Sequence, residues 1–483
     1  MNEKKAIYQQ MFYSTGKYVV LKNIFMVVSG IIGIFVVRLL GPYEYGKYSL
    51  VWQLISTIGP IISLGWLTTL ARFIPEKSTI PEKAILFSQS VISVLLFSVI
   101  FFVGMIIFVR LFPGLIPIEV RQIKLAFGIF VILVAFFNIF EGVYRGLGKF
   151  NEWTIIDGLR SNLSSVLAII LLVIGYRYYQ TIIFSNFVFG LIFVILIFNY
   201  LIKYLNINFS KLWGNWPVDS SVRNFALTML IGQIVFLLGS SIDSILLRAL
   251  LKDPAQVGIY NAGIRIPKMI EAMLIAPLPA PFLYYFSHPE LGQSREKILE
   301  FGSRLLGVIF GFCGIFLFSF SQEIILFLFG SNYSESIMVL RIFSLILYLL
   351  GFNILVSPYF QSINKPQIPL FAGIISFVIF FVGDILLIPE FKSIGPAITV
   401  LIGLFIQTMF IFYFLSRLNV KYLTNLILLT LCIIVSVFIG FYTVFYISLL
   451  IFIIFIILTR LITLEDIKRW QSVTFVTTKN IKS

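Results

Sequence analysis

Three charged side chains share one face of an apolar stretch in the middle of the chain, "GIRIPKMIEAMLIAPLPAPF". Arg265, Lys268 and Glu271 follow one another at intervals of three residues, so a helix places them on one side. Guanidinium and ammonium groups bind phosphate, and a carboxylate can take up a proton or a cation. A charge that faced lipid would cost several kcal/mol. We therefore expect these side chains to line a hydrated cavity, with pairing of Arg265 or Lys268 to Glu271 as the alternative.

Charged residues interrupt other apolar runs as well. Asp157 and Arg160 lie three residues apart and could pair, Arg341 has no partner nearby in its run, and Asp243 lies on a polar helical face. Those near the ends of runs, such as Asp384, could instead meet lipid headgroups. The candidate cations for an anionic group are Arg265, Lys268, Arg341, Arg160, Arg38 and Arg72, and the candidate cavity or coupling carboxylates are Asp243, Glu271, Asp157 and Asp384.

The elements that must hold these charges are long apolar helices. Hydrophobic residues make up 59% of the 483 residues and charged residues only 12%, whereas soluble proteins carry roughly a quarter. A span needs about 20 apolar residues, so we predict an all-α polytopic membrane protein with about 14 transmembrane helices. The last two predicted spans are separated by very little sequence, so a protein with thirteen spans is the alternative. The predicted spans are 18–40, 46–71, 84–109, 122–144, 153–175, 180–202, 224–249, 257–284, 301–320, 336–359, 367–389, 394–416, 423–443 and 445–463.

The distribution of lysine and arginine predicts the orientation. With a cytoplasmic N-terminus, 23 of the 36 basic residues fall in cytoplasmic segments and 9 in outer ones. We expect a multi-pass protein of the cytoplasmic membrane with both termini in the cytoplasm. The net charge of +15 then favours anionic membrane lipids as partners and not nucleic acid. The polar N-terminus lacks the pattern of a cleaved signal peptide.

Several short patterns occur twice at a nearly constant spacing. "LLGPYEYGKYSL" and "LLKDPAQVGIYNAG" place Gly46 and Gly258 212 positions apart, and "VYRGLGKF" and "YFQSINKP" place Lys149 and Lys365 216 apart. The spacing covers six spans, an even number, which predicts parallel repeats. We expect two six-helix lobes with a central cleft, followed by two additional helices. The predicted parts are 1–205 (first lobe), 206–222 (cytoplasmic linker), 223–418 (second lobe), 419–464 (two additional spans) and 465–483 (cytoplasmic tail).

These patterns also resemble a known family. "RLLGPYEYGKYSL", "RGLGKF", "SIDSILLRALLKDPAQVGIYNAG" and "LLIPEFKSIGPAI" are similar to the Wzx-type oligosaccharide flippases, the polysaccharide-exporter branch of the multidrug/oligosaccharidyl-lipid/polysaccharide superfamily. The resemblance spans about residues 15–460. It implies flipping of a lipid-linked (polyprenyl) oligosaccharide across the cytoplasmic membrane by alternating access, for assembly of surface polysaccharide. Coupling to H⁺ or Na⁺ would use one of the candidate carboxylates.

Other functions have less support. Two cysteines in apolar runs and a single histidine leave little for a metal site, a thiol nucleophile or a histidine base, so we expect no enzyme, metal or cofactor. A cation-coupled multidrug exporter of the same superfamily is the main alternative. A membrane glycosyltransferase or polymerase would need a larger outer loop, and a passive scaffold would leave the buried charges unexplained. A single chain would already form the cleft, so we expect a monomer.

Overall fold

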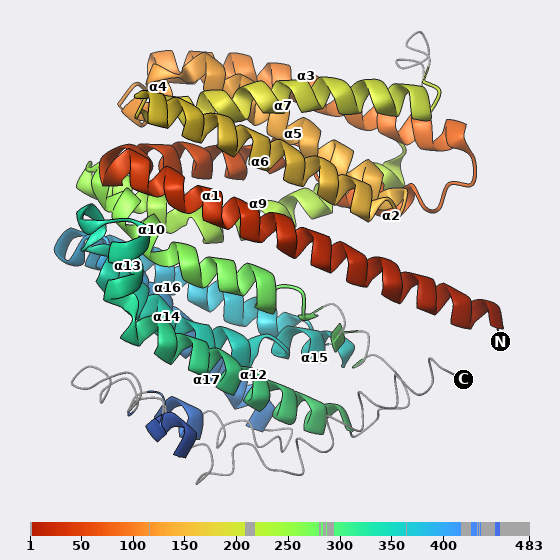
Figure 1. Ribbon diagram of the computed structural model, residues 1–483. Helices are drawn as coiled ribbons and strands as arrows, with labels where there is room; N and C mark the ends of the chain where they lie inside the picture. The colour runs from red at the N-terminus through yellow and green to blue at the C-terminus, as the bar shows by residue number, and fades with distance from the viewer. Residues whose placement is uncertain are drawn as a thin grey trace. The chain divides into compact units, whose positions relative to one another are not determined.

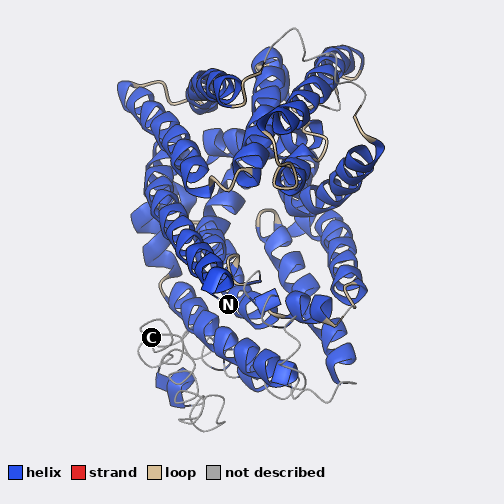
Figure 2. Ribbon diagram, turned by 90° about the vertical axis from the view of Figure 1, so that its right-hand side faces the viewer, coloured by secondary structure: helices blue, strands red, loops and turns tan. Residues whose placement is uncertain are grey.

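The described part of the chain consists of helices. The computed structural model describes residues 2–114, 116–207, 218–279, 294–363 and 365–416, with short pieces between 282 and 286, 427 and 435, and 450 and 454. Every regular element in it is helical (Figure 2). Nine of these described helices are long and apolar enough to cross a membrane. The prediction of an all-α protein with many spans is therefore confirmed.

Four predicted segments lie largely or wholly outside the described residues. They are the two additional spans at 423–443 and 445–463, the linker at 206–222, and the tail at 465–483. The chain divides into two compact units, Met1–Gly258 and Ile259–Ser483, and we describe the helices of each unit separately.

The first unit surrounds one central helix. α5 is the most buried of its long helices, and it contacts α1, α2, α3, α6 and α7. Its buried aromatic residues, such as Phe130 and Phe140, belong to the hydrophobic core of the unit. The helices of this unit, labelled in Figure 1, are α1 (Asn2–Ile62), α2 (Trp66–Phe73), α3 (Ile80–Leu111), α4 (Ile118–Gln122), α5 (Lys124–Gly146), α6 (Phe150–Ile174), α7 (Tyr179–Tyr204), α9 (Ser220–Leu251) and the start of α10 (Pro254–Ile270).

Local sequence signals explain where these helices begin and break. Gly41 has φ 73° and ψ 168°, so α1 consists of two helical segments that meet at a kink. The predicted span at 18–40 lies in the first segment, whereas the predicted span at 46–71 continues past the end of α1 into α2. α3 begins with a capping box in which Thr79 and Glu82 satisfy each other's backbone N–H groups, and Pro81 occupies the first turn.

α9 packs against the first helices of the chain, although it follows the predicted linker. It contacts both α1 and α2 within the first unit. Near its N-terminal end, the guanidinium of Arg72 lies 4.4 Å from the centre of the Phe225 ring, which itself meets Phe73 edge to face. At its C-terminal end, Arg248 is held by an ion pair that is described below. Side-chain contacts therefore hold α9 near both of its ends.

The second unit also has one deeply buried helix. α14 contacts α12, α13 and α17, and the long apolar segment that it starts is the most buried of the nine described spans. Tyr348, Phe352 and Tyr359 from this segment contribute to the core. The elements of this unit, after the end of α10, are η2 (Glu271–Ile275), α12 (Ser294–Ser319), α13 (Ser321–Leu328), η4 (Ser331–Tyr333), α14 (Ser336–Asn353), α15 (Val356–Ser362), α16 (Gln367–Phe391) and α17 (Ile394–Ser416).

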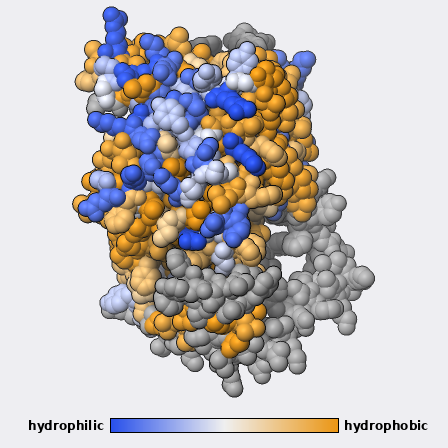
Figure 3. Space-filling model, turned by 60° about the vertical axis from the view of Figure 1, so that its left-hand side comes forward, coloured by the Kyte–Doolittle hydropathy of each residue, from blue (hydrophilic) through white to orange (hydrophobic). Residues whose placement is uncertain are grey.

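Large hydrophobic side chains are exposed along the outer helices. In α3, for example, Val99 is 62% and Ile100 66% exposed, and in α16 Leu386 is 65% exposed. Figure 3 shows hydrophobic side chains over much of the surface that faces the viewer. Exposed apolar area on this scale is typical of helices that face lipid.

Candidate functional site

The charged face of the central stretch lies at a change of helix type. Arg265 and Lys268 belong to α10, and Glu271 is the first residue of the π-helical turn η2. The N–H of Ala276 donates to the Glu271 carbonyl at 2.9 Å. Three prolines, Pro277, Pro279 and Pro281, follow in the sequence, and the π-helical turn begins six residues before the first of them. π-turns inside helices are frequent at functional sites.

Lys268 and Glu271, two of the three charged residues of this face, differ in their exposure. Lys268 is exposed, while Arg265 and Glu271 are half-buried. Among the described residues, Lys268 makes no ion pair with Glu271, although the two lie three positions apart. The structure therefore does not contain the Lys268–Glu271 pair, which is one of the two pairings in the alternative, and it leaves the Lys268 side chain exposed.

Arg341 lines a cavity at one end of the second unit. Its Nε donates to Ser321 Oγ at 2.9 Å, and its guanidinium lies 5.7 Å from the centre of the Phe318 ring. The cavity has a volume of about 470 Å³ and also receives Lys392. Neighbouring residues in the sequence offered no partner for Arg341, because Ser321 and Lys392 come from other segments. The lining residues are Gln322, Ser334, Glu335, Ile337, Met338, Arg341, Phe391, Lys392, Ser393 and Ile394.

Asp384 is fully buried between α16 and α17. Its Oδ1 accepts a hydrogen bond of 2.5 Å from Thr399 Oγ1, and that hydroxyl also lies 2.9 Å from the Pro396 carbonyl. The sequence left a headgroup contact open for Asp384, because it is near the end of a predicted span. The structure instead gives it an interior position, where a change of protonation or the binding of a cation would have a large energetic effect.

The remaining candidates are placed in the first unit. Arg160 donates to Asp157 through Nη2 at 2.6 Å and Nε at 3.1 Å, so these two do pair. Asp243 is half-buried in α9. Arg38 and Arg72 are exposed on α1 and α2, and Arg72 stacks on aromatic rings as described above.

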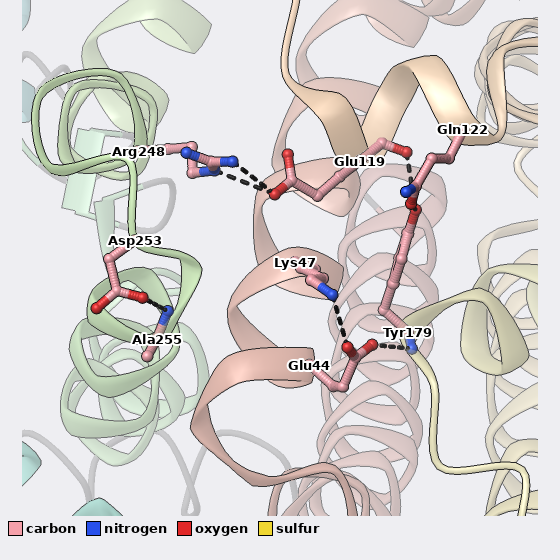
Figure 4. Close-up of polar contacts among 8 residues, drawn as sticks. All are labelled: Glu44, Lys47, Glu119, Gln122, Tyr179, Arg248, Asp253 and Ala255. Carbon is pink, nitrogen blue, oxygen red and sulfur yellow. Dashed lines mark hydrogen bonds and ion pairs between the residues drawn. The ribbon is translucent and has the colours of Figure 1, made fainter.

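A polar network that sequence reasoning missed joins four segments of the first unit (Figure 4). Arg248, in the last turn of α9, donates to Glu119 Oε1 through Nη2 at 2.8 Å and Nε at 3.1 Å. The Glu119 side chain is only 4% exposed and that of Arg248 14%. The Tyr179 hydroxyl donates to the Glu119 carbonyl at 2.9 Å and lies 3.2 Å from Gln122 Oε1. The ion pair therefore fixes α9 to α4.

A second carboxylate extends the same network to α1. Glu44 accepts hydrogen bonds from the backbone N–H of Tyr179 at 2.9 Å and from Lys47 Nζ at 2.7 Å. The ammonium of Lys47 also lies 4.1 Å from the centre of the Tyr43 ring. All these residues belong to connections that the predicted topology places on the outer side. Their sequence signal is weak, because each resembles an ordinary charge at the end of a span.

Comparisons with known proteins agree with this architecture. A family model described as "Polysaccharide biosynthesis protein" matches residues 14–282, more than half of the chain. The capsular polysaccharide biosynthesis protein CapF of Staphylococcus aureus is 25% identical over 309 residues, which cover 59% of this chain and 74% of CapF.

Solved structures share the fold at low sequence identity. The lipid II flippase MurJ in an inward closed conformation is similar with a TM-score of 0.69 and 16% identity, over 91% of this chain and 97% of MurJ. An inward-facing multidrug resistance MATE transporter of the MOP superfamily is similar with a TM-score of 0.64 and 16% identity, over 84% of this chain and 99% of the transporter. The predicted resemblance to a polysaccharide family is confirmed: the chain belongs to the polysaccharide biosynthesis protein (Polysacc_synt) family, as a multi-pass membrane protein with the fold of MurJ and the MATE transporters.

Proposed function

We propose that the chain is a transporter that flips a lipid-linked oligosaccharide across the cytoplasmic membrane for surface polysaccharide assembly. The family to which it belongs supports a place in polysaccharide biosynthesis, and the transporter fold supports movement of a molecule and no enzymatic step. The observation that carries the proposal is the pair of cations, Arg341 and Lys392, in one cavity of a membrane protein. Two such donors suit the phosphate groups of a polyprenyl-linked sugar.

The proposed mechanism is alternating access. Arg265 and Lys268 hold the anionic headgroup in a hydrated cleft, Arg341 and Lys392 receive it at the outer end, and the lipid tail remains in the bilayer. Arg160, Arg38 and Arg72 are further candidate contacts for the substrate. In this proposal both termini are cytoplasmic, a single chain acts as a monomer, and the six-helix lobes are residues 1–205 and 223–418 of a protein with 14 spans.

The central helices support the proposed duplication. α5 begins at Lys124 and α14 at Ser336, so the buried helices of the two units start at the same spacing that separates Gly46 from Gly258. A shared position in two repeats explains why each is surrounded by other helices.

Uptake of H⁺ or Na⁺ by a carboxylate is the proposed source of energy. Asp384 suits this role because it is fully buried and already accepts a hydrogen bond from Thr399. Asp243, Glu271 and Asp157 are the other candidates. Asp157 is the least suited of them, because its side chain is 45% exposed and it pairs with Arg160.

The test is reconstitution of the purified protein in vesicles that carry a fluorescent lipid-linked saccharide. Protein-containing vesicles should expose label from the inner leaflet to an external quencher, and protein-free vesicles should not. The Lys268→Glu variant should flip slowly, whereas Gly104→Ala, a change on a helix surface with open space around it, should flip at the normal rate. Equal protection of the label with and without protein would contradict the proposal.

The second candidate function is cation-coupled export of drugs. The similarity to a multidrug resistance MATE transporter favours it. Export of cationic drugs would not depend on Lys268, and a Lys268→Glu change would preserve or raise it. Loss of glycolipid flipping in this variant supports the first function. Drug export by a parent protein that flips no glycolipid supports the second.

A further inference from the structure

The two copies of a short motif contact each other directly in the first unit. Residues 42–48 read "PYEYGKY" and residues 254–260 read "PAQVGIY". Each has proline, three residues, glycine, one residue and tyrosine. Proline and glycine of the first copy are both 212 positions from those of the second.

The contact is reciprocal and involves the backbones. A Cβ atom on Gly46 would lie 1.7 Å from the carbonyl oxygen of Pro254 and 2.8 Å from the nitrogen of Gly258. A Cβ atom on Gly258 would lie 2.0 Å from the carbonyl oxygen of Pro42 and 2.9 Å from the nitrogen of Gly46. Each glycine therefore rests on the proline carbonyl of the other copy. Contacts in which i meets j and j meets i are characteristic of a two-fold axis.

Polar contacts hold the segments on both sides of this crossing. Glu44, inside the first motif, accepts hydrogen bonds from Tyr179 and Lys47. The buried Glu119–Arg248 pair holds the end of α9, and the carboxylate of Asp253 accepts the N–H of Ala255 at the start of α10 (Figure 4). The crossing is thus a tight backbone contact, and hydrogen bonds and an ion pair stabilise the segments beside it.

We propose that the Gly46–Gly258 crossing is the outer closure of the transport path, fastened by the Glu119–Arg248 ion pair. The inference rests on the proposed alternating access, in which the two repeats must part on the outer side to release the substrate. Two glycines let the repeats meet without side chains between them, so the contact closes fully and separates without repacking a core. The ion pair, accessible to water once α9 moves, stabilises the closed form until the substrate or coupling ion shifts the balance.

The test introduces a methyl group at each glycine and measures access from outside. Gly46→Ala and Gly258→Ala are compared with Gly104→Ala and Gly373→Ala, helical glycines around which the structure leaves open space. All variants carry Ala262→Cys, a fully buried position one turn beyond Gly258, with Cys313 and Cys432 replaced by serine. An impermeant maleimide is added to right-side-out vesicles without substrate.

We expect labelling to rise several-fold in both Gly46→Ala and Gly258→Ala and to stay at the parent level in the two controls. Glu119→Gln, which introduces no steric change, should also raise labelling and keeps the test informative if a glycine variant does not fold. Parent-level labelling in folded Gly46→Ala, Gly258→Ala and Glu119→Gln would overturn the inference, as would a response of one glycine only.

These outcomes separate the closure from the transported substrate. Raised labelling in a protein that flips no glycolipid would leave the closure intact and refute the proposed function. Unchanged labelling in a protein that flips glycolipid would support the proposed function and refute the closure.

Discussion

Neutralising Glu119 should destabilise the first unit far more than neutralising an exposed acid. In the Glu119→Gln variant the guanidinium of Arg248, only 14% exposed, would lose its counter-charge while remaining largely out of water. Removal of one partner from a buried ion pair costs about 3–5 kcal/mol. For a unit of this size 1 kcal/mol corresponds to a shift of about 2 °C in Tm, so we expect a decrease of roughly 6–10 °C.

Asp157 provides a matched control for this measurement. Its pair with Arg160 has similar hydrogen bonds, but it lies within one helix and the Asp157 side chain is 45% exposed. Pairs of this kind contribute about 0.5 kcal/mol or less. Asp157→Asn should therefore change Tm by about 1 °C. The assay is thermal unfolding of purified protein in detergent, followed by size-exclusion chromatography of the heated samples.

A double variant tests whether the loss comes from the unpaired charge. Glu119→Gln combined with Arg248→Gln removes both charges, so it should recover part of the Tm that Glu119→Gln loses. The reasoning would be refuted if Glu119→Gln and Asp157→Asn had equal effects, or if the losses of the two single variants at Glu119 and Arg248 simply added in the double variant.

Further predictions concern the cations and the buried carboxylate. Lys268→Gln should lower the flipping rate by roughly ten- to a hundredfold, because a charged hydrogen bond contributes about 1.5–3 kcal/mol. Lys268→Glu should lower the rate further, and equal rates for the parent and both variants would contradict a headgroup contact. Lys392→Gln should weaken protection of the protein by inorganic pyrophosphate against heating, while leaving Tm without ligand unchanged, and an unaltered pyrophosphate effect would exclude the cavity as a phosphate site. Asp384→Asn should abolish stimulation of flipping by an ion gradient, and persistence of that stimulation would remove Asp384 from the coupling step. Thr399→Val should leave the gradient dependence in place but lower Tm by roughly 2–6 °C, since a buried acceptor loses a donor at a cost of about 1–3 kcal/mol, and an unchanged Tm would show that this hydrogen bond is dispensable.

Helices were predictable from the sequence because length and hydropathy suffice to define a membrane span. The predicted span at 84–109 corresponds to α3, Ile80–Leu111, and that at 367–389 to α16, Gln367–Phe391. In each case the ends differ by a few residues, because caps and polar side chains at the interface extend the helix beyond its apolar part. The kink of α1 at Gly41 lies in the connection between the predicted spans at 18–40 and 46–71.

Partners of charged residues could not be predicted in the same way. Glu119 and Arg248 are 129 positions apart, and their meeting depends on how α9 packs against α4. Arg341 and Lys392 share a cavity only because the connection between α16 and α17 lies beside the start of α14. The repeated glycines indicated a duplication, but nothing in their spacing revealed that the two copies touch. A short apolar motif can indicate the local conformation of its own residues, but it does not indicate which other segment it contacts in the folded protein.

The position of α9 also has a consequence for synthesis of the protein. A ribosome that has just completed Glu119 must add another 129 residues before Arg248 exists. At about 5–20 residues per second this takes roughly 6–26 s. During that interval the carboxylate has no cation from α9 and must stay hydrated at the membrane surface. The first six helices can therefore enter the bilayer early, but the nascent unit acquires its final packing only after the chain has passed the midpoint of its length.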